Sequence, residues 1–231
     1  MARDLGNVVP WKERYRVDNV PWPIRPFWFA ASVALGVTQY LVVHAFPHLT
    51  SRIEIRGDLR RETPAIYAIW HGEVFAMFTA FGRFPGLVVI NHPLWYMKRT
   101  HVMLNCFGVK RIFLGSTGHG GREAAQRLAA YLRENPASSF INPDGPVGPW
   151  HDIKKGVFHL ALQSGRPIIP VAISARPAIR LGGWDRKLIP LPFSRIVVTV
   201  GEPIFVPTED FSEAAKKLRA GLDAYTLETS P

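Results

Sequence analysis

Residues 52–225 alternate short apolar runs, typical of strands, with longer segments of helical periodicity. The expected strands cover 52–56, 65–70, 86–90, 111–114, 138–141, 167–173 and 195–200, and the clearest helical patterns cover 119–133, 156–164 and 209–225. Several expected strands are apolar throughout, as strands buried on both faces are. Strands that alternate with helices form a parallel sheet with helical cover. The sequence predicts an α/β fold over residues 51–231, with a mainly parallel central sheet flanked by helices.

Residues 1–50 form a segment of different character. Residues 27–46, FWFAASVALGVTQYLVVHAF, contain no Asp, Glu, Lys or Arg. A helix of this length spans about 30 Å, the thickness of a bilayer's hydrocarbon core. Basic residues with interleaved tryptophans, typical of a membrane–water interface, lie before it or at its start: Lys12, Arg14, Arg16 and Arg25, with Trp11, Trp22 and Trp28. We expect a membrane-associating helix here; a helix buried in the protein's own core is the alternative.

The direction of such a helix follows from the distribution of charge. A full span would keep the basic N-terminal residues in the cytoplasm and send the rest of the chain, which is also basic, outward. A helix that lies on one face of the membrane avoids this conflict. We therefore expect a monotopic protein on the cytoplasmic face of the inner (plasma) membrane.

The formal net charge of +10 predicts an anionic partner. Arg and Lys are spread along the chain, without zinc-finger spacing or an aromatic RNA-binding signature, so we expect anionic lipids and no nucleic acid. Nucleic-acid binding through the basic surface is a weaker alternative. The spacing of His, Asp and Glu predicts no metal site. The single cysteine, Cys106, excludes an internal disulfide.

Polar and glycine-rich residues directly follow four of the expected strands. They are His71-Gly72-Glu73, Asn91-His92, the stretch GSTGHGGR at 115–122 and the stretch NPDGP at 142–146. Ligands of parallel sheets bind beyond the carboxyl ends of the strands, so one shared cleft is expected. GSTGHGGR also opens a helix, where free backbone N–H groups can hold an anion; an ordinary capped loop is the alternative.

From His71 to Pro207 the sequence resembles the glycerolipid (lysophospholipid) acyltransferase superfamily, and within it a bacterial branch described as a domain of unknown function. The matching pieces are WHG at 70–72, NH at 91–92, LGST at 114–117, NPDGPVGP at 142–149, KKGVFHLALQSGRPIIPV at 154–171 and WDRKLIPLPFSRIVVTVGEPI at 184–204. The resemblance implies transfer of a fatty acyl group from acyl-CoA or acyl carrier protein to a hydroxyl or amine of a lipid-like acceptor. It implies no bound cofactor, since the thioester is a co-substrate.

The signature of this superfamily is His-x-x-x-x-Asp, in which the histidine is the general base and the aspartate orients it. The run that resembles it begins at His92, and Met97 stands in the place of the acid. His71 is a second candidate base. Glu73 and Asp144 are the candidate replacements for the missing carboxylate.

The resemblance also implies substrate-binding residues. Asp144 and Gly145 match the acceptor-binding block, and Leu114 replaces an arginine that would meet an acceptor phosphate. We expect other groups to bind phosphates or the acceptor near the cleft: Gly115, Ser116, Thr117, Arg122 and Lys154. The run 184–186 receives no role beyond loop structure. The competing function is a catalytically impaired lipid-binding protein of the same fold, which the changes at Met97 and Leu114 favour.

Overall fold

The structure is a computed structural model of the 231-residue chain, and it describes residues 15–59 and 63–224. A seven-stranded sheet of order β1-β7-β6-β2-β5-β3-β4 forms the centre of the described part. Its strands are β1 (Arg52–Arg56), β2 (Ile66–Ala68), β3 (Leu87–Asn91), β4 (Arg111–Leu114), β5 (Ser138–Ile141), β6 (Ile168–Arg180) and β7 (Leu188–Val200). Each neighbouring pair is parallel except β6 and β7. The predicted mainly parallel α/β fold is confirmed.

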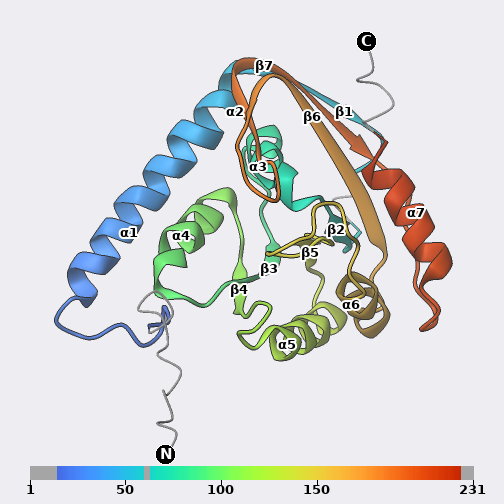
Figure 1. Cartoon of the computed structure of the whole chain (residues 1–231), viewed down its shortest axis with the longest axis horizontal. Coiled ribbons are helices and arrows are strands. Elements are labelled where there is room, and N and C mark those ends of the chain that lie inside the picture. The colour runs from blue at the N-terminus through green and yellow to red at the C-terminus, as the bar shows by residue number, and fades with distance from the viewer. Residues whose placement is uncertain (1–14, 60–62, 225–231) are drawn as a thin grey trace, which may run out of the picture.

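Helices cover both faces of the sheet (Figure 1). They are α3 (Val74–Phe81), α4 (Lys98–Phe107), α5 (Gly121–Glu134), α6 (Gly156–Ser164) and α7 (Ser212–Leu222), with short 3-10 turns η3 (His71–Glu73) and η4 (Trp95–Met97). Side chains of β2 alternate between two cores, as the period of two in a strand requires. Tyr67 joins the core of α3 and α4, whereas Ile66 and Ala68 join the core of α5, α6 and α7.

The β6–β7 hairpin is longer than the sequence pattern indicated. The pattern predicted strands at 167–173 and 195–200, but both strands have 13 residues. A register shift between Arg176 and Ala178 bends the hairpin, and opposite it Ser194 donates to the carbonyl oxygen of Pro177. Beyond the bend the hairpin folds back (Figure 1). Its tip at residues 181–187 meets η3, where the Asp185 carbonyl oxygen lies against Gly72.

A long helix at the edge of the molecule consists of α1 (Arg25–Gln39), the π-helical η2 (Tyr40–Ala45) and α2 (Phe46–Thr50). Its inner side packs closely on the domain: Trp28 Nε1 donates to the Trp95 carbonyl oxygen at 3.1 Å, and a Cβ on Gly36 would lie 2.5 Å from the Arg99 carbonyl oxygen. By length and composition the helix could cross a membrane, yet only 17% of its apolar window is buried. The core-helix alternative is therefore not what the structure shows. Trp11, Lys12 and Arg14 lie outside the described residues.

Candidate active site

The carboxyl ends of β2, β5, β3 and β4 form one edge of the sheet, because these strands are consecutive neighbours. The structure places His71 after β2, Asp144 after β5, His92 after β3 and Ser116 after β4, in that order along the edge. Neighbouring strands lie about 4.8 Å apart, so His92 lies roughly 10 Å along the edge from His71. The edge thus has two separate histidine positions.

The ring of His71 contacts a carboxylate from the hairpin tip. Nδ1 of His71 lies 2.7 Å from Oδ2 of Asp185, which is 114 residues further along the chain. Lys187 Nζ binds the same carboxylate oxygen and lies 3.4 Å from His71 Nδ1. The Trp184 ring stacks on the imidazole, with centroids 5.1 Å apart and an interplanar angle of 26°. Three tip residues therefore surround one histidine ring.

Two glycines allow this close approach. A Cβ on Gly72, directly after the histidine, would overlap the Asp185 carbonyl oxygen. A Cβ on Gly148, in the loop after β5, would lie 2.6 Å from the Trp184 ring, and its φ of +75° is itself a conformation that glycine favours. The segments NPDGPVGP and WDRK, distant in sequence, therefore meet at Trp184 beside His71.

Charge around His71 favours a neutral ring. Burial lowers the pKa of His71 below its usual 6.5, the Lys187 charge lowers it further, and the hydrogen bond and charge of Asp185 oppose them. The pKa of Asp185 is lowered: burial raises it, but the hydrogen bonds and charges of Lys187 and His71 outweigh burial. An ionised carboxylate can only accept, so His71 Nδ1 carries the proton and donates it. The lone pair of a neutral His71 is then on Nε2.

Asp144 fixes the backbone at the same place. Its Oδ1 accepts the His71 backbone N–H at 3.0 Å, and the residue is fully buried. Burial raises the pKa of Asp144 from 3.8 to about 6. Oδ2 makes no hydrogen bond with any residue that the structure describes. A buried carboxylate oxygen without a hydrogen bond is uncommon in folded proteins.

Glu73 lies apart from the ring contact. It is buried, and its Oε2 accepts the Ile173 N–H at 3.2 Å, which ties η3 to β6. The sequence offered Glu73 or Asp144 as the orienting acid; the carboxylate that contacts the His71 ring is that of Asp185. The physical reason is the long hairpin, whose return brings a residue from far along the chain to the end of β2.

His92 has a different environment. Its Nδ1 accepts the Leu94 backbone N–H at 3.4 Å, its ring lies 4.8 Å from that of His119, and His101 Nε2 donates to its carbonyl oxygen at 3.2 Å. With Nδ1 as an acceptor, the neutral ring carries its proton on Nε2. This tautomer is the opposite of the one that Asp185 imposes on His71.

The predicted anion loop forms a tight turn at the β4 end of the edge. Ser116 and His119 exchange backbone hydrogen bonds of 3.2 and 2.8 Å, and Thr117 lies in the turn. A Cβ on Gly115 would lie 2.5 Å from that of Ala124, so α5 packs tightly here. Arg122 is exposed in the first turn of α5. This loop is three strands from His71, roughly 14 Å along the edge.

Lys154 lies on the loop that carries Asp144. Its backbone N–H donates to the Pro143 carbonyl oxygen at 2.9 Å, and Nζ lies 3.1 Å from the position that a Cβ on Gly145 would take. The structure thus brings Asp144, Gly145 and Lys154 together near His71. Among the described residues, no group of three His, Cys, Asp or Glu side chains is arranged to hold a metal ion.

Sequence reasoning missed Asp185 and Lys187. They lie in the run WDRK at 184–187, inside a segment that carried the resemblance, and that inclusion was the only signal for them. Neither spacing nor periodicity relates residue 185 to residue 71.

Comparisons with known proteins find only limited similarity. No protein-family model matches the chain. An uncharacterized protein, RP090, of Rickettsia prowazekii (strain Madrid E) is 30% identical over 146 residues, or 62% of this chain. The match spans 65% of that relative's length. Among solved structures, the 1-acyl-sn-glycerophosphate (LPA) acyltransferase PlsC from Thermotoga maritima has a TM-score of 0.49 and 14% identity, over 89% of this chain and 80% of that one. An activity of this chain is therefore inferred from the geometry of its own site.

Proposed function

We propose that this chain is a membrane-associated acyltransferase that moves a fatty acyl group from acyl-CoA or acyl carrier protein to a hydroxyl (or amine) of a lipid-like acceptor. The observation that carries the proposal is the hydrogen bond of 2.7 Å between His71 Nδ1 and Asp185 Oδ2. A histidine held by a carboxylate at Nδ1, with Nε2 left as a base, is the pair that acyl transfer to a hydroxyl requires.

The proposed reaction needs no group beyond the two substrates. Nε2 of His71 takes the proton of the acceptor hydroxyl, and the hydroxyl oxygen attacks the thioester carbonyl carbon. The carbon–sulfur bond breaks, and the leaving thiolate takes the proton from the imidazolium. An ester and a free thiol result, and the ring returns to its neutral form. Asp185 stabilises the transient imidazolium, and no acyl-enzyme forms, so Cys106 has no role in the step.

The resemblance supports the same assignment. The segments that carried it, NPDGPVGP and WDRK, meet at Trp184 against the His71 ring. Asp144 presents the acceptor-binding oxygen in this proposal, and Lys154 is a cation for a donor or acceptor phosphate. Gly115, Ser116, Thr117 and Arg122 remain candidates for the more distant part of a long substrate. Glu73 has a supporting role through the β6 backbone.

The membrane part of the proposal rests on the outer face of α1–α2. Phe27 and Leu49, near its two ends, are 80% and 81% exposed, and the chain carries a formal net charge of +10. Apolar side chains on one face of a surface helix, with basic charge nearby, suit an anionic membrane surface. We propose a monotopic protein on the cytoplasmic face of the inner (plasma) membrane, without a nucleic-acid partner.

Acyl transfer from labelled acyl-CoA and acyl carrier protein into a total lipid extract tests the proposal. We expect wild type to transfer, and His71→Ala and Asp185→Asn to lose about 10²- to 10⁴-fold in rate, because each removes part of the base. The conservative variant Glu73→Gln, which keeps an acceptor for the Ile173 N–H, is expected to retain most of the activity.

Two results would redirect the proposal. Activity that survives His71→Ala but is lost in His92→Ala would make His92 the base. Wild type that binds lipid but transfers from none of the donors would favour the lipid-binding alternative, which the methionine at position 97 already motivates.

A further inference from the structure

We propose that Lys187 is a positioning residue of this site, which holds the Asp185 carboxylate against the His71 ring and keeps the imidazole unprotonated. The inference rests on the proposed role of His71 as the base. It adds a third residue, from the same hairpin tip, whose role is to set the charge state of the pair.

The contacts of Lys187 converge on one oxygen atom. Nζ of Lys187 and Nδ1 of His71 both bind Oδ2 of Asp185. The carboxylate is therefore held by two groups: the His71 ring in η3 and the Lys187 ammonium in the hairpin tip. The lysine and histidine side chains are each 26% exposed, so solvent screens their interaction only in part.

The position of Lys187 is itself fixed. Its carbonyl oxygen accepts the Leu181 N–H at 2.9 Å, which closes the tip of the hairpin. Its ammonium lies 5.9 Å from the centroid of the Phe75 ring on α3. These contacts hold Nζ beside the pair rather than in solvent.

The charge of Lys187 opposes protonation of the imidazole, which a histidine–carboxylate pair alone would favour. A lone carboxylate beside an imidazole favours the imidazolium, which cannot act as a base. A cation 3.4 Å from Nδ1 opposes that protonation. The ring then stays neutral at rest and accepts a proton only from the substrate.

The charged groups around His71 come from three elements. Asp185 and Lys187 belong to the hairpin tip, and Asp144, after β5, binds the His71 backbone N–H. In η3, Glu73 accepts the Ile173 N–H. The guanidinium of Arg186 lies over the Trp150 ring, 4.6 Å from its centroid. Lys187 is the cation for which the structure gives a direct contact with the His71 ring.

Titration of His71 by NMR tests this inference without any assay of activity. We expect Lys187→Met to raise the pKa of His71 by about 1 unit or more, because it removes a neighbouring positive charge. Lys187→Arg keeps the charge and is expected to stay near wild type. Asp185→Asn removes a negative charge and is expected to shift the pKa downward. A loss of local packing has no reason to produce shifts of opposite sign in two neighbouring variants.

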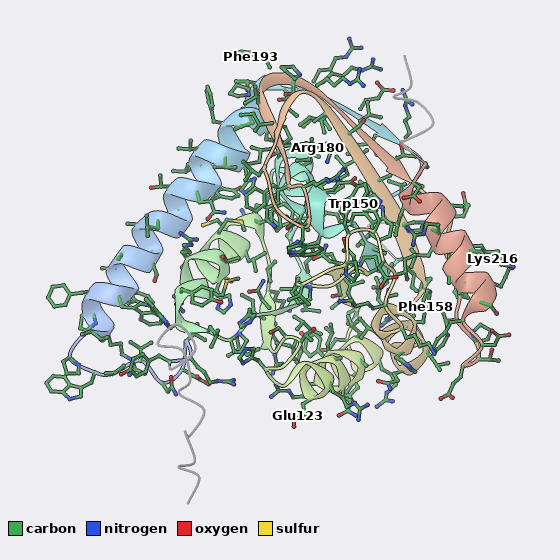
Figure 2. The ribbon with its side chains drawn as sticks, viewed as in Figure 1. Glu123, Trp150, Phe158, Arg180, Phe193 and Lys216 are labelled. Atoms are coloured by element: carbon green, nitrogen blue, oxygen red, sulfur yellow. The ribbon has the colours of Figure 1, made fainter. Side chains whose placement is uncertain are left out.

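Lys216→Met is the matched control, since Lys216 is an exposed lysine on α7, at the far side of the molecule from α1 (Figure 2). The inference is overturned if Lys187→Met moves the His71 pKa no more than this control does. If the shift appears but wild type transfers no acyl group, the positioning role stands and the proposed function fails. In an active enzyme, the acidic limb of the pH–rate profile should move to higher pH in Lys187→Met by the shift measured by NMR.

Discussion

Two histidines at one edge of the sheet differ in the nitrogen that carries the proton. Nδ1 of His71 donates to Asp185, whereas Nδ1 of His92 accepts the Leu94 N–H. The hydrogen bond at Nδ1 decides which nitrogen keeps a lone pair. This difference supports the proposal of His71 as the base, although the sequence pattern pointed first to His92. It also gives Met97 a simple reading, because His92 needs no acid if it is not the base.

At Asp144, stability conflicts with the role proposed for this residue in acceptor binding. Its pKa in the folded chain, about 6, lies above the usual 3.8. The folded state therefore binds the proton more tightly, and the stability that this gives is lost as the pH rises through about 6. We expect Asp144→Asn, which keeps an acceptor for the His71 N–H, to raise the free energy of unfolding by about 1–3 kcal/mol at pH 8.

Urea denaturation of wild type and Asp144→Asn at pH 8 and pH 4.5 measures this effect on stability. The gain should be smaller at pH 4.5, where the wild-type carboxyl is largely protonated in the folded chain. A gain of equal size at both pH values would contradict the electrostatic cause. We expect the same variant to lose transfer activity. Its amide nitrogen takes the place of Oδ2, and this nitrogen cannot accept a hydrogen bond.

At the scale of elements, the β6–β7 hairpin supplies the carboxylate of the proposed site. Its bend at Arg176–Ala178 returns the tip to the end of β2, and Gly72 provides the space in which the tip docks. We expect Gly72→Ala to displace the tip, because the added methyl group overlaps the Asp185 carbonyl oxygen. The His71–Asp185 bond should lengthen or break. Activity should fall at least about 10²-fold, and overpacking should cost about 1–3 kcal/mol of stability.

Gly156→Ala is the control for this substitution. A Cβ on Gly156, the first residue of α6, meets no atom within 4 Å. Alanine also favours the helix, so stability should be unchanged or rise by up to about 1 kcal/mol, with activity unchanged. Thermal unfolding and acyl transfer of both variants compare the two sites. A Gly72→Ala variant as active as Gly156→Ala would show that tip docking is dispensable.

At the scale of the whole molecule, the outer face of α1–α2 is continuous with the bend of the hairpin. Phe193 at the bend is 76% exposed, and its N–H donates to Thr50 Oγ1 at 3.4 Å, at the end of α2. Figure 2 shows Phe193 beside that end of the helix. An apolar surface of this extent on a basic protein is expected to bind anionic bilayers.

Sedimentation with vesicles that contain anionic lipid measures this binding. We expect Phe27→Glu to weaken the partition of the protein by about 10- to 100-fold, because one phenylalanine side chain leaves the interface. Phe205→Glu is the matched control: Phe205 is 71% exposed but follows β7, next to Ile204, which pairs with the start of β6. Equal losses in the two variants would contradict a specific role for the helix. Binding to anionic vesicles should also weaken as salt rises.

The sequence by itself determined the secondary structure of this protein and the strand ends at which its polar residues lie. Apolar runs and helical periodicity predicted the seven strands, the mainly parallel order and the helices α5, α6 and α7, because burial on two faces leaves a pattern that a single chain segment can display. The strand-end rule placed His71, Asp144, His92 and Ser116 on one edge of the sheet. The apolar composition of residues 27–46 predicted a helix suited to a membrane surface, and the structure shows a long, largely exposed one.

Only the tertiary structure decided which groups touch. The pairing of His71 with Asp185 joins residues 114 positions apart, and it depends on a hairpin bend, a register shift and two glycines in contact with other segments. None of these has a period that a sequence window can display. Charge states followed from the same contacts, since burial and neighbouring groups set each pKa only after the chain has folded. The sequence contains several carboxylates that could pair with a histidine, and only the folded structure shows that Asp185 contacts His71.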